Sequence, residues 1–538
     1  MMQLAKRNKY HPESSWLSIR VFIGAGLVIF LLSACTDKKQ ESLYTDITEK
    51  LILKCDANCD QVANKVTALN GTVTYSYQNI SALAVTVPIA NVNKLKQLAG
   101  VNSVKKDNLI PRPKVPKTFI KDRNNVIYSS RSNVAANNFK TEALDIKALI
   151  ATNPIKPNNY IYNNIINGVA KLHLQDITGK GVVVAIIDSG TANNSDTVPA
   201  LAGSVIGGEN LVDLIDEPSA TSTLNDDHGT MVGSMIAAHL SMIMPNTSPF
   251  IRSVSIHAPQ SVFPVDADNS LVPMLGTAPD ASLYPLKVFS AVGDGGAPNS
   301  VIIAAMDRAL TLKKNYDMGM NTDAVAGDGS EDNPYIYDAL NIQVVNMSLG
   351  GITLFPGNDV EDLLVIEMLK NGITVVTSAG NEGFGAMTGG SPGTSTGTIS
   401  VGAANSPVHE RILRDMQDQV GAGIEFRPND IMQTAFFSSR GPTADGRVGV
   451  DLVANGFAAF TQAADGSIAF VSGTSFSSPT VAGAAALLWS ATNEQEQEVS
   501  AAHIRAALIK SANPDMLDNE GDLPIDRGNG YLDAAAAL

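Results

Sequence analysis

From about residue 167 to the C-terminus, apolar runs typical of strands alternate with the patterns of helices. The clearest run covers residues 182–187, is apolar at every position and is followed directly by Asp188. An uninterrupted apolar strand is typically buried on both faces, as in a parallel sheet covered by helices. The alternation therefore predicts an α/β fold with a mostly parallel sheet. Asp188 would lie at its C-terminal edge, where such folds bind ligands.

Two further polar residues lie where a helix is predicted to begin. His228 is followed by Gly229 and other small residues, so its ring could project into a cleft. Ser475 precedes an Ala-rich helix with Pro479 in its first turn, where a serine often acts as a cap. Taken singly, Asp188, His228 and Ser475 each have an ordinary structural interpretation, as a turn residue, a buried histidine and a cap.

Together, the three segments resemble the signature motifs of the subtilase family, in that family's order of Asp, His and Ser. Other segments of the chain resemble further family motifs in the right order: residues 276–288, 346–350, 377–383, 437–442 and 528–530. The resemblance covers residues 167–538. It implies a subtilisin-like three-layer α/β fold and a serine endopeptidase that cuts protein or peptide substrates.

The resemblance also implies a role for each residue that matches a family motif. Ser475 would attack the peptide carbonyl, His228 would carry the proton, and Asp188 would orient the histidine. The Asn381 side-chain amide and the Ser475 backbone N–H would bind the oxyanion. Substrate binding is expected at Ser348, Leu349, Gly350, Ala379 and Gly380.

The chain departs from the usual family pattern at a few positions near these motifs. Phe476 stands where methionine is common beside the nucleophile, and its larger side chain is expected to crowd the site. Met231 and Ser234 occupy packing positions, and Asn455 replaces a usual proline. None of these changes removes a catalytic group. The chemistry requires no metal or other cofactor. Structural calcium is frequent in the family, but no acidic loop here has convincing ligand spacing.

The N-terminus has the pattern of an export signal. Four basic residues precede an apolar run at residues 21–32, which is too short to span a bilayer comfortably. The run leads into Leu32-Ser33-Ala34-Cys35, which resembles the bacterial lipobox, so Cys35 is expected to be acylated. Thr36 follows where an aspartate would favour retention at the inner membrane, so the outer membrane is expected. An ordinary cleaved signal and a retained anchor are the alternatives.

The domain organisation follows from these features. After a polar spacer, a module with the order strand, helix, strand, strand, helix, strand is expected, as in ferredoxin-like folds. Its position before the catalytic segment resembles the inhibitor-type prodomain of subtilases, although an unrelated α+β domain is the alternative. Its C-terminal end would lead into the cleft like a product. The predicted units are a signal peptide (1–34), a spacer (35–43), the prodomain (44–111), a linker with the maturation region (112–165) and the catalytic domain (166–538).

Composition narrows the partners and the redox chemistry. The formal net charge is -15, and no basic stretch follows the extreme N-terminus, so a nucleic-acid partner is not expected. The chain has 3 cysteines, and Cys55 and Cys59 are either a disulfide or two free thiols. No histidine lies near them to complete a zinc site. A monomer is expected.

Three classes of function compete. The first is an active endopeptidase that is anchored through Cys35, inhibited by its own prodomain, and released to the periplasm or medium when the linker is cut. The second is a catalytically silent peptide-binding lipoprotein, which would be free to lose the catalytic groups that this chain retains. The third is a nucleotide-binding α/β protein, but the strand before Asp188 lacks the Gly-rich turn which that class needs.

Overall fold

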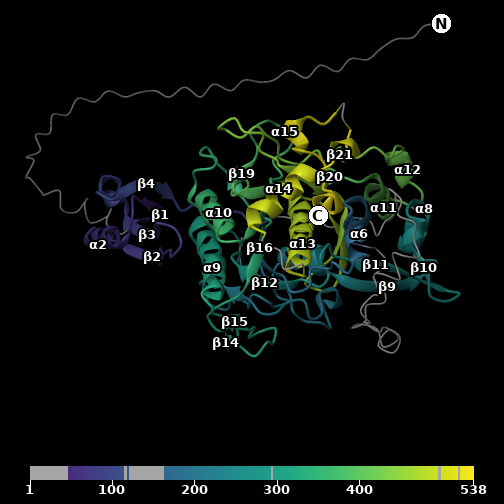
Figure 1. Ribbon diagram of the computed structural model, residues 1–538, viewed down its shortest axis with the longest axis horizontal. Coiled ribbons are helices and arrows are strands. Elements are labelled where there is room, and N and C mark those ends of the chain that lie inside the picture. Colours follow the sequence, from purple (N-terminus) through teal and green to yellow (C-terminus); the bar gives the residue numbers. More distant parts are fainter. Residues whose placement is uncertain (1–46, 114–117, 120–162, 293–294, 495–498, 519–520) are drawn as a thin grey trace, which may run out of the picture.

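The computed structural model describes residues 47–113, 118–119, 163–292, 295–494, 499–518 and 521–538. The predicted signal peptide, the lipidation site at Cys35 and most of the predicted linker lie outside these residues. In Figure 1 a small N-terminal module lies beside a larger body, next to the helices α9 and α10 of that body.

The N-terminal module is a four-stranded antiparallel sheet with two helices. The strand order is β2-β3-β1-β4, and β1 pairs antiparallel with both β3 and β4. This order confirms the ferredoxin-like prediction. The elements are β1 (Thr48–Cys55), α2 (Asp60–Ala68), β2 (Thr72–Ser76), β3 (Ala82–Pro88), α3 (Val92–Leu95) and β4 (Val101–Lys106).

The module has a hydrophobic core of its own. Val62 and Val66, one turn apart on α2, pack with Leu53 and Leu83 of the sheet. Helix α2 ends before Gly71, where an added Cβ would lie only 2.5 Å from a methyl of Val87. Burial of these side chains away from the rest of the chain indicates a unit that can fold separately.

The larger body is built on a sheet of eight strands. Its order is β21-β20-β18-β16-β7-β12-β8, with β22 also paired to β20. Every neighbouring pair is parallel except β20 and β21, which confirms the predicted mostly parallel sheet. The strands are β7 (Val183–Asp188), β8 (Glu209–Asn210), β12 (Ser282–Lys287), β16 (Ile342–Met347), β18 (Thr374–Ser378), β20 (Thr398–Asn405), β21 (Gln433–Thr434) and β22 (Leu452–Asn455).

Helices cover both faces of this sheet and make three layers. Successive residues of β7 point to opposite faces: Val184 and Ile186 belong to one core, and Ala185 and Ile187 to another. The first core includes α7 (Asp227–Ala237), α13 (Thr474–Glu494) and α14 (Ala501–Ser511). The second includes α9 (Asn299–Asp317) and α10 (Val360–Lys370), and it confirms the three-layer prediction.

A second, smaller sheet and two helices form a subdomain beside the main sheet. Strands β9 and β11 pair in a separate three-stranded sheet with β10, and α8 packs on α11. Asp415 of α11 accepts hydrogen bonds from Ser253 at 2.7 Å and His257 at 3.0 Å, which joins the two helices. The elements are β9 (His239–Pro245), α8 (Pro249–His257), β10 (Phe263–Pro264), β11 (Asn269–Leu275), α11 (Pro407–Gln417) and α12 (Gly423–Phe426).

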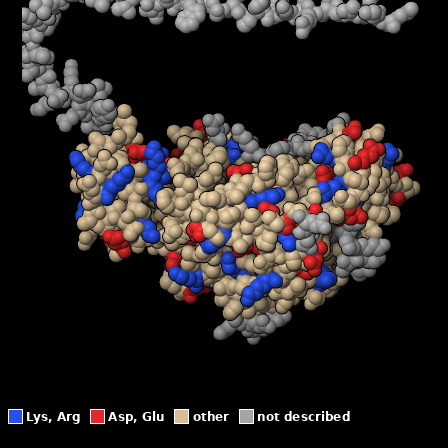
Figure 2. All heavy atoms as spheres, turned by 90° about the horizontal axis from the view of Figure 1, so that it is seen from above, with Lys and Arg blue, Asp and Glu red and all other residues tan. Residues whose placement is uncertain are grey.

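On the face shown in Figure 2, Lys and Arg side chains are scattered rather than gathered in one continuous patch.

Short helices and strands complete the described residues. The elements are β5 (Leu109–Ile110), β6 (Thr118–Phe119), β13 (Ala297–Pro298), β14 (Ala324–Ala326), β15 (Ile336–Tyr337), β17 (Gly351–Ile352), β19 (Gly390–Ser391), β23 (Ala459–Gln462), β24 (Ile468–Val471), α5 (Asn163–Ile166), α6 (Val169–His173), α15 (Pro524–Arg527), α16 (Ala534–Ala537), η1 (Ile89–Asn91), η3 (Pro199–Leu201), η4 (Pro259–Ser261) and η5 (Pro514–Met516).

The module docks on the N-terminal end of α9. The Tyr77 hydroxyl donates to the Ser300 carbonyl at 3.0 Å, and Asp107 accepts hydrogen bonds from both the backbone and the hydroxyl of Ser300. A carboxylate at a helix N-terminus is stabilised by the exposed N–H groups there. The following strand β5 pairs antiparallel with β13, just before α9. The module is therefore held in a defined orientation, with its C-terminal end directed along the larger body.

Candidate active site

Asp188 and His228 form a buried hydrogen-bonded pair. Asp188 ends β7, and His228 lies in the first turn of α7. The His228 Nδ1 atom is 2.8 Å from Asp188 Oδ1, and both side chains are 0% exposed. A carboxylate on Nδ1 favours the tautomer with the proton there, so Nε2 is left as the basic nitrogen. Two residues that are 40 positions apart in the sequence are thus brought into one hydrogen-bonded pair.

The loop after β7 holds the start of α7 in place. Asp226 caps the helix, because its Oδ1 accepts a hydrogen bond from the His228 backbone N–H at 3.0 Å. The Ser189 hydroxyl donates to the Asp226 carbonyl and accepts from the Gly229 N–H. A side chain at position 229 could not fit, since its Cβ would lie 2.1 Å from the Gly190 carbonyl oxygen. The ring of His228 is therefore oriented by backbone contacts as well as by Asp188.

Ser475 lies in the first turn of α13 and contacts Ser348, which directly follows strand β16. Its Oγ donates to the Ser348 carbonyl at 3.3 Å, and the Ser348 hydroxyl donates to the Ser475 carbonyl at 2.8 Å. The predicted nucleophile is thus hydrogen-bonded to the strand end that the sequence predicts to bind substrate. Hydrogen bonds between a nucleophile and its base are often poorly aligned until a substrate is bound.

Phe476 is not among the residues that line the cleft, so it crowds the site from the core side, against His228, rather than from the substrate side. Its side chain is fully buried, and its ring centroid lies 5.7 Å from that of His228, at a tilt of 57°. The reason is its position on α13, where it faces the core rather than the substrate side. It packs against the imidazole and restricts the positions that the ring can take.

Asn381 lies beside the N-terminus of α13. Its side-chain oxygen accepts hydrogen bonds from the Thr474 backbone N–H at 2.9 Å and the Thr474 hydroxyl at 3.1 Å. Because an acceptor must face these donors, the Nδ2 group is the end of the amide that remains available to donate. A Cβ added at Gly473 would lie 3.7 Å from Nδ2, so the amide donor is close to the chain leading into Ser475.

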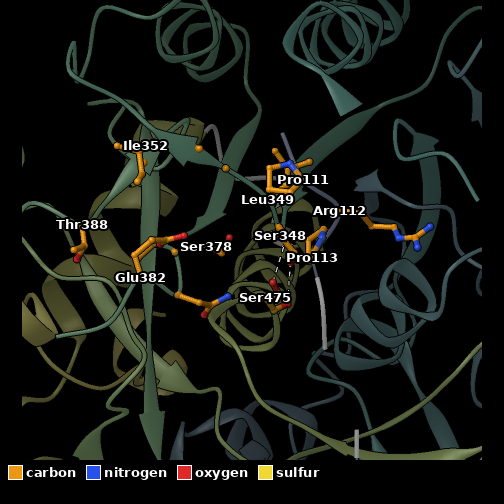
Figure 3. A pocket seen from close by; sticks show the side chains of 16 residues that line it. Pro111, Arg112, Pro113, Ser348, Leu349, Ile352, Ser378, Glu382, Thr388 and Ser475 are labelled. Carbon is orange, nitrogen blue, oxygen red and sulfur yellow. Dashed lines mark hydrogen bonds between the residues drawn. The ribbon is translucent and has the colours of Figure 1, made fainter. Parts of the chain in front are cut away.

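One cleft brings together two of the four predicted catalytic residues and every predicted substrate-binding residue, whereas Asp188 and His228 are not among the residues that line it. It encloses about 310 Å³, and Ser475 and Asn381 line it together with all five predicted substrate-binding residues, Ser348, Leu349, Gly350, Ala379 and Gly380. Figure 3 shows Ser348 and Ser475 at its centre. Gly351, Ile352, Ser378, Glu382, Thr388 and Gly390 also line it and were not predicted. Gly351 directly follows the motif at residues 346–350, and Ser378 and Glu382 lie within the motif at residues 377–383, which is the signal that could have found them.

The C-terminal tail of the N-terminal module occupies the same cleft. Pro111, Arg112 and Pro113 line it, directly after β5 pairs with β13 (Figure 3). The segment enters the cleft as a short extended strand, in the way predicted for the end of the module. Residues 112–113 were predicted as linker. They are instead bound segments of the cleft, and β6 further along the linker pairs with β24.

A second cavity of about 620 Å³ lies between the module and the body. Ile52 and Lys105 of the module line it together with Asp359 and Glu361 of the larger body. Burial, the largest cause, raises the pKa of Glu361 from 4.5 to about 8, and the charges of Asp359 and Asp362 raise it further while Lys105 lowers it. Burial likewise raises the pKa of Asp362 to about 6. The interface therefore contains a carboxyl group that is neutral near pH 7.

The described residues contain no group of three or more His, Cys, Asp or Glu side chains that could hold a metal ion. No helix among them combines the length and the apolar character needed to cross a membrane.

Comparison with known proteins gives matches over both units. The model of the subtilase family matches residues 179–531, and that of a peptidase inhibitor domain matches residues 39–107. Subtilisin E of Bacillus subtilis is 29% identical over 323 residues, which cover 59% of this chain and 58% of that protein. Pyrolysin of Pyrococcus furiosus is 39% identical over 153 residues, 27% of this chain and 11% of that protein. Tripeptidyl-peptidase 2 of Arabidopsis thaliana is 35% identical over 201 residues, 35% and 13% of the two chains.

Proposed function

Because the chain belongs to the subtilase family, we propose that it is a serine endopeptidase that hydrolyses peptide bonds through an acyl-enzyme on Ser475. The observation that carries the proposal is the arrangement around one cleft. A serine at a helix N-terminus and an amide donor on Asn381 line it. The buried Asp188–His228 pair lies behind them, with the His228 ring 5.7 Å from that of Phe476, the residue after Ser475. A catalytically silent binder would have no need to keep these four side chains in this arrangement.

In the proposed reaction, Ser475 Oγ forms a bond to the carbonyl carbon of the substrate while His228 Nε2 takes the hydroxyl proton. Asp188 stabilises the imidazolium that results. The negative oxygen accepts hydrogen bonds from Asn381 Nδ2 and the Ser475 N–H, at the positive end of α13. His228 then gives the proton to the leaving amine, and water releases the acyl group by the reverse steps. No step requires a metal.

The substrate is proposed to bind as an extended strand. The pairing of β5 with β13 shows that this edge of the cleft accepts an antiparallel strand, with Ile110 opposite Ala297. Ser348, Leu349 and Gly350 lie on the other side and offer backbone groups. Such pairing recognises the backbone of many sequences, so preference must come from individual side-chain pockets.

A fluorophosphonate probe tests the proposal directly, because it reacts only with an activated serine. The probe should form one adduct, on Ser475, as read by mass spectrometry of tryptic peptides. The Ser475→Ala protein should give no adduct. Absence of labelling in protein that has lost its N-terminal module would favour the silent peptide binder instead.

The N-terminal module is proposed to inhibit the catalytic domain until it dissociates. Its tail lies in the cleft, and its sheet is anchored on α9 through Tyr77 and Asp107. A group whose pKa is raised in the complex, such as Glu361, takes up a proton on binding. Binding is therefore strongest at low pH, weakens as the pH rises above 4.5, and levels off above about 8.

We expect the inhibition constant of residues 47–113 against mature enzyme to rise by about tenfold or more between pH 5 and pH 8. The physical reason is that Glu361 lines the cavity between the two units together with Ile52 and Lys105, and burial in the complex raises its pKa. The measurement is peptide hydrolysis at a series of module concentrations and pH values. Glu361→Gln is the matched control, because it is neutral throughout and should flatten the profile. Equal pH slopes in the two proteins would contradict the role of Glu361.

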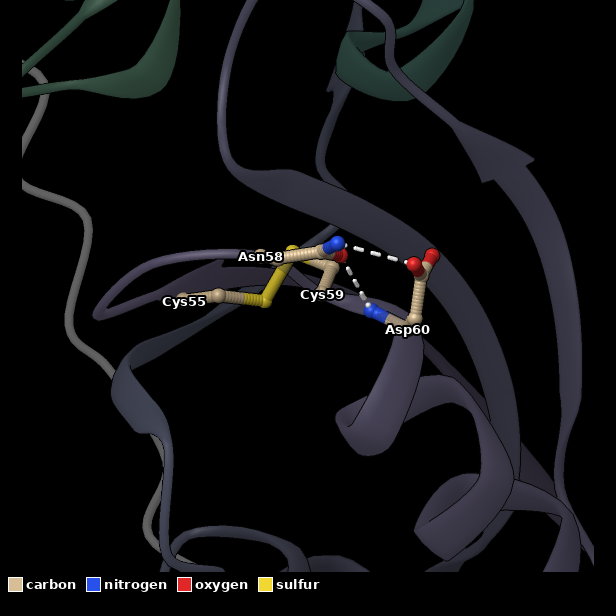
Figure 4. Close-up of a disulfide and its surroundings, with 4 residues drawn as sticks. All are labelled: Cys55, Asn58, Cys59 and Asp60. Carbon is tan, nitrogen blue, oxygen red and sulfur yellow. Dashed lines mark hydrogen bonds between the residues drawn. A yellow bond between two sulfur atoms is a disulfide. The ribbon is translucent and has the colours of Figure 1, made fainter.

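The N-terminus is proposed to anchor the precursor, with lipid on Cys35 and the outer membrane as its location. Cys55 and Cys59 form a disulfide between β1 and α2 (Figure 4), and disulfides persist mainly in exported proteins. Of the two interpretations that the sequence allows, the structure contains the disulfide. The lipid would tether the module rather than the catalytic domain, so a cut in the linker would sever the enzyme from the membrane.

Cell fractionation tests this anchoring and release. Wild-type catalytic domain should appear soluble and shortened, whereas the Ser475→Ala chain should stay full-length in the membrane fraction, because several acyl chains give stable anchoring. A Cys35→Ala chain is the control and should leave the membrane fraction even when uncut. Active, full-length wild type in membranes would exclude release.

A further inference from the structure

Arg112 of the module tail occupies a polar recess beside His228. Its Nη1 donates to the Ser290 carbonyl at 2.9 Å, and its Nε lies 3.4 Å from Asp226 Oδ2. The side chains of Arg112 and Asp226 are only 24% and 30% exposed, so the contact is partly shielded from water. In Figure 3 the Arg112 side chain extends away from the other residues of the cleft.

The recess is formed by groups that other contacts hold in place. The Asp226 carboxylate caps α7 through Oδ1, which leaves Oδ2 to face the guanidinium. On the other wall, Glu217 accepts hydrogen bonds from the Ser290 hydroxyl and the Ala291 N–H, and forms an ion pair with buried Lys287 at 2.7 Å. Lys287 therefore balances the charge of Glu217, while the Asp226 carboxylate is balanced by the arginine.

The backbone around Arg112 is that of a bound substrate strand. A proline on each side favours an extended conformation, since proline fixes its own φ and restricts the residue before it. Ile110, two residues earlier, pairs with Ala297 across the strand β13, and Pro113, one residue later, lines the cleft with Ser475. We take Pro113, which lines the cleft together with Ser475, as the counterpart of the residue just before the cut bond, so that Arg112 corresponds to the penultimate residue.

From this placement we propose that Asp226 and the Ser290 carbonyl form a subsite for a basic side chain of the substrate, preferably arginine, at the penultimate position before the cut bond. The proposal rests on the proposed peptidase function and names its substrate class. The module tail fills the subsite with Arg112 and so imitates a substrate. An arginine can donate to the carbonyl and pair with the carboxylate at once, whereas lysine has a single charged nitrogen for both.

The test uses peptide p-nitroanilides, whose cut bond is fixed by the nitroaniline. The series is succinyl-Ala-Ala-Xaa-Phe-p-nitroanilide, with Arg, Lys, Gln or norleucine at Xaa. The enzyme is the full chain, incubated until its activity is constant. We expect kcat/KM for Arg to exceed that for norleucine by about ten- to a hundredfold, the range for a hydrogen-bonded charge. Lys should lie between them, and added salt should reduce the ratio.

Asp226→Asn is the decisive variant, because asparagine is as good a helix cap as aspartate and only the charge is lost. Its Arg/norleucine ratio should fall to within about threefold of unity. Asp227→Asn is the control, since the Asp227 carboxylate is next in the chain but accepts from the Ala464 N–H instead. It should keep the preference for arginine.

Each outcome bears on the proposal. A wild-type ratio near unity, or an undiminished ratio in Asp226→Asn, would overturn it even if the peptides are cut well. If Asp226→Asn weakens binding of the module but wild type shows no preference for arginine, Arg112 is an intramolecular contact only, and the subsite is refuted. If no peptide of the series is cut and Ser475 takes no fluorophosphonate, the peptidase function itself fails.

Discussion

Replacing Ser475 with alanine should lower kcat for peptide hydrolysis by roughly a million-fold, with little change in KM. The hydroxyl is the atom that forms the acyl bond, and the Ser348 carbonyl that now accepts from it at 3.3 Å cannot substitute for it. His228→Ala should cost about as much, and the double variant scarcely more, because members of such a unit fail together. Steady-state kinetics of the three variants, purified without their N-terminal module, measures this.

The control for Ser475→Ala is the same substitution on the same helix. The Ser490 hydroxyl donates to the Lys180 carbonyl at 3.2 Å, far along α13 from the cleft, and Ser490→Ala should cost stability only. Because Ser475→Ala cannot process itself, the module must be removed by an added protease before the assay. Near-native hydrolysis by Ser475→Ala would refute the assignment of the nucleophile.

The fold and the positions of the candidate catalytic groups could be predicted because the determining signals are local. An apolar run followed by Asp188 places that carboxylate at the C-terminal end of a buried parallel strand. This placement does not depend on how the rest of the chain folds. Small residues after His228 allow its helix to approach the loop at Gly190. A Cβ atom added at Gly229 would lie only 2.1 Å from the Gly190 carbonyl oxygen. The order and spacing of these segments then carry the family resemblance, which the match over residues 179–531 confirms.

The rest depends on contacts between distant residues, for which no local pattern exists. Phe476 packs on His228 because of the direction in which α13 presents it, and its residue type alone suggests crowding of the cleft. Arg112 and Asp226 meet only because the module docks on α9 in one orientation. The sequence shows two ordinary charged residues, and only the docked structure shows that they form a pair.

The orientation of Asn381 makes its loss the second large effect expected here. Asn381→Leu should lower kcat by about a hundred- to a thousandfold, because the oxyanion loses a side-chain donor. KM should change little, since the donor acts mainly on charge that develops in the transition state. The complication is that Asn381 Oδ1 also accepts from the Thr474 N–H, so leucine removes two contacts at once.

Asn381→Asp separates the two contributions. Aspartate has the same shape and keeps an acceptor for the Thr474 N–H at 2.9 Å, but it replaces the donor with a negative oxygen. If the contact to Thr474 were what matters, Asn381→Asp would keep nearly full activity. If the amide donates to the oxyanion, the aspartate repels it and kcat should fall at least as far as with leucine. Parallel kcat and KM measurements above pH 6, where a solvent-accessible aspartate is ionised, decide between the two. Full activity in Asn381→Asp would exclude the side chain from the oxyanion site.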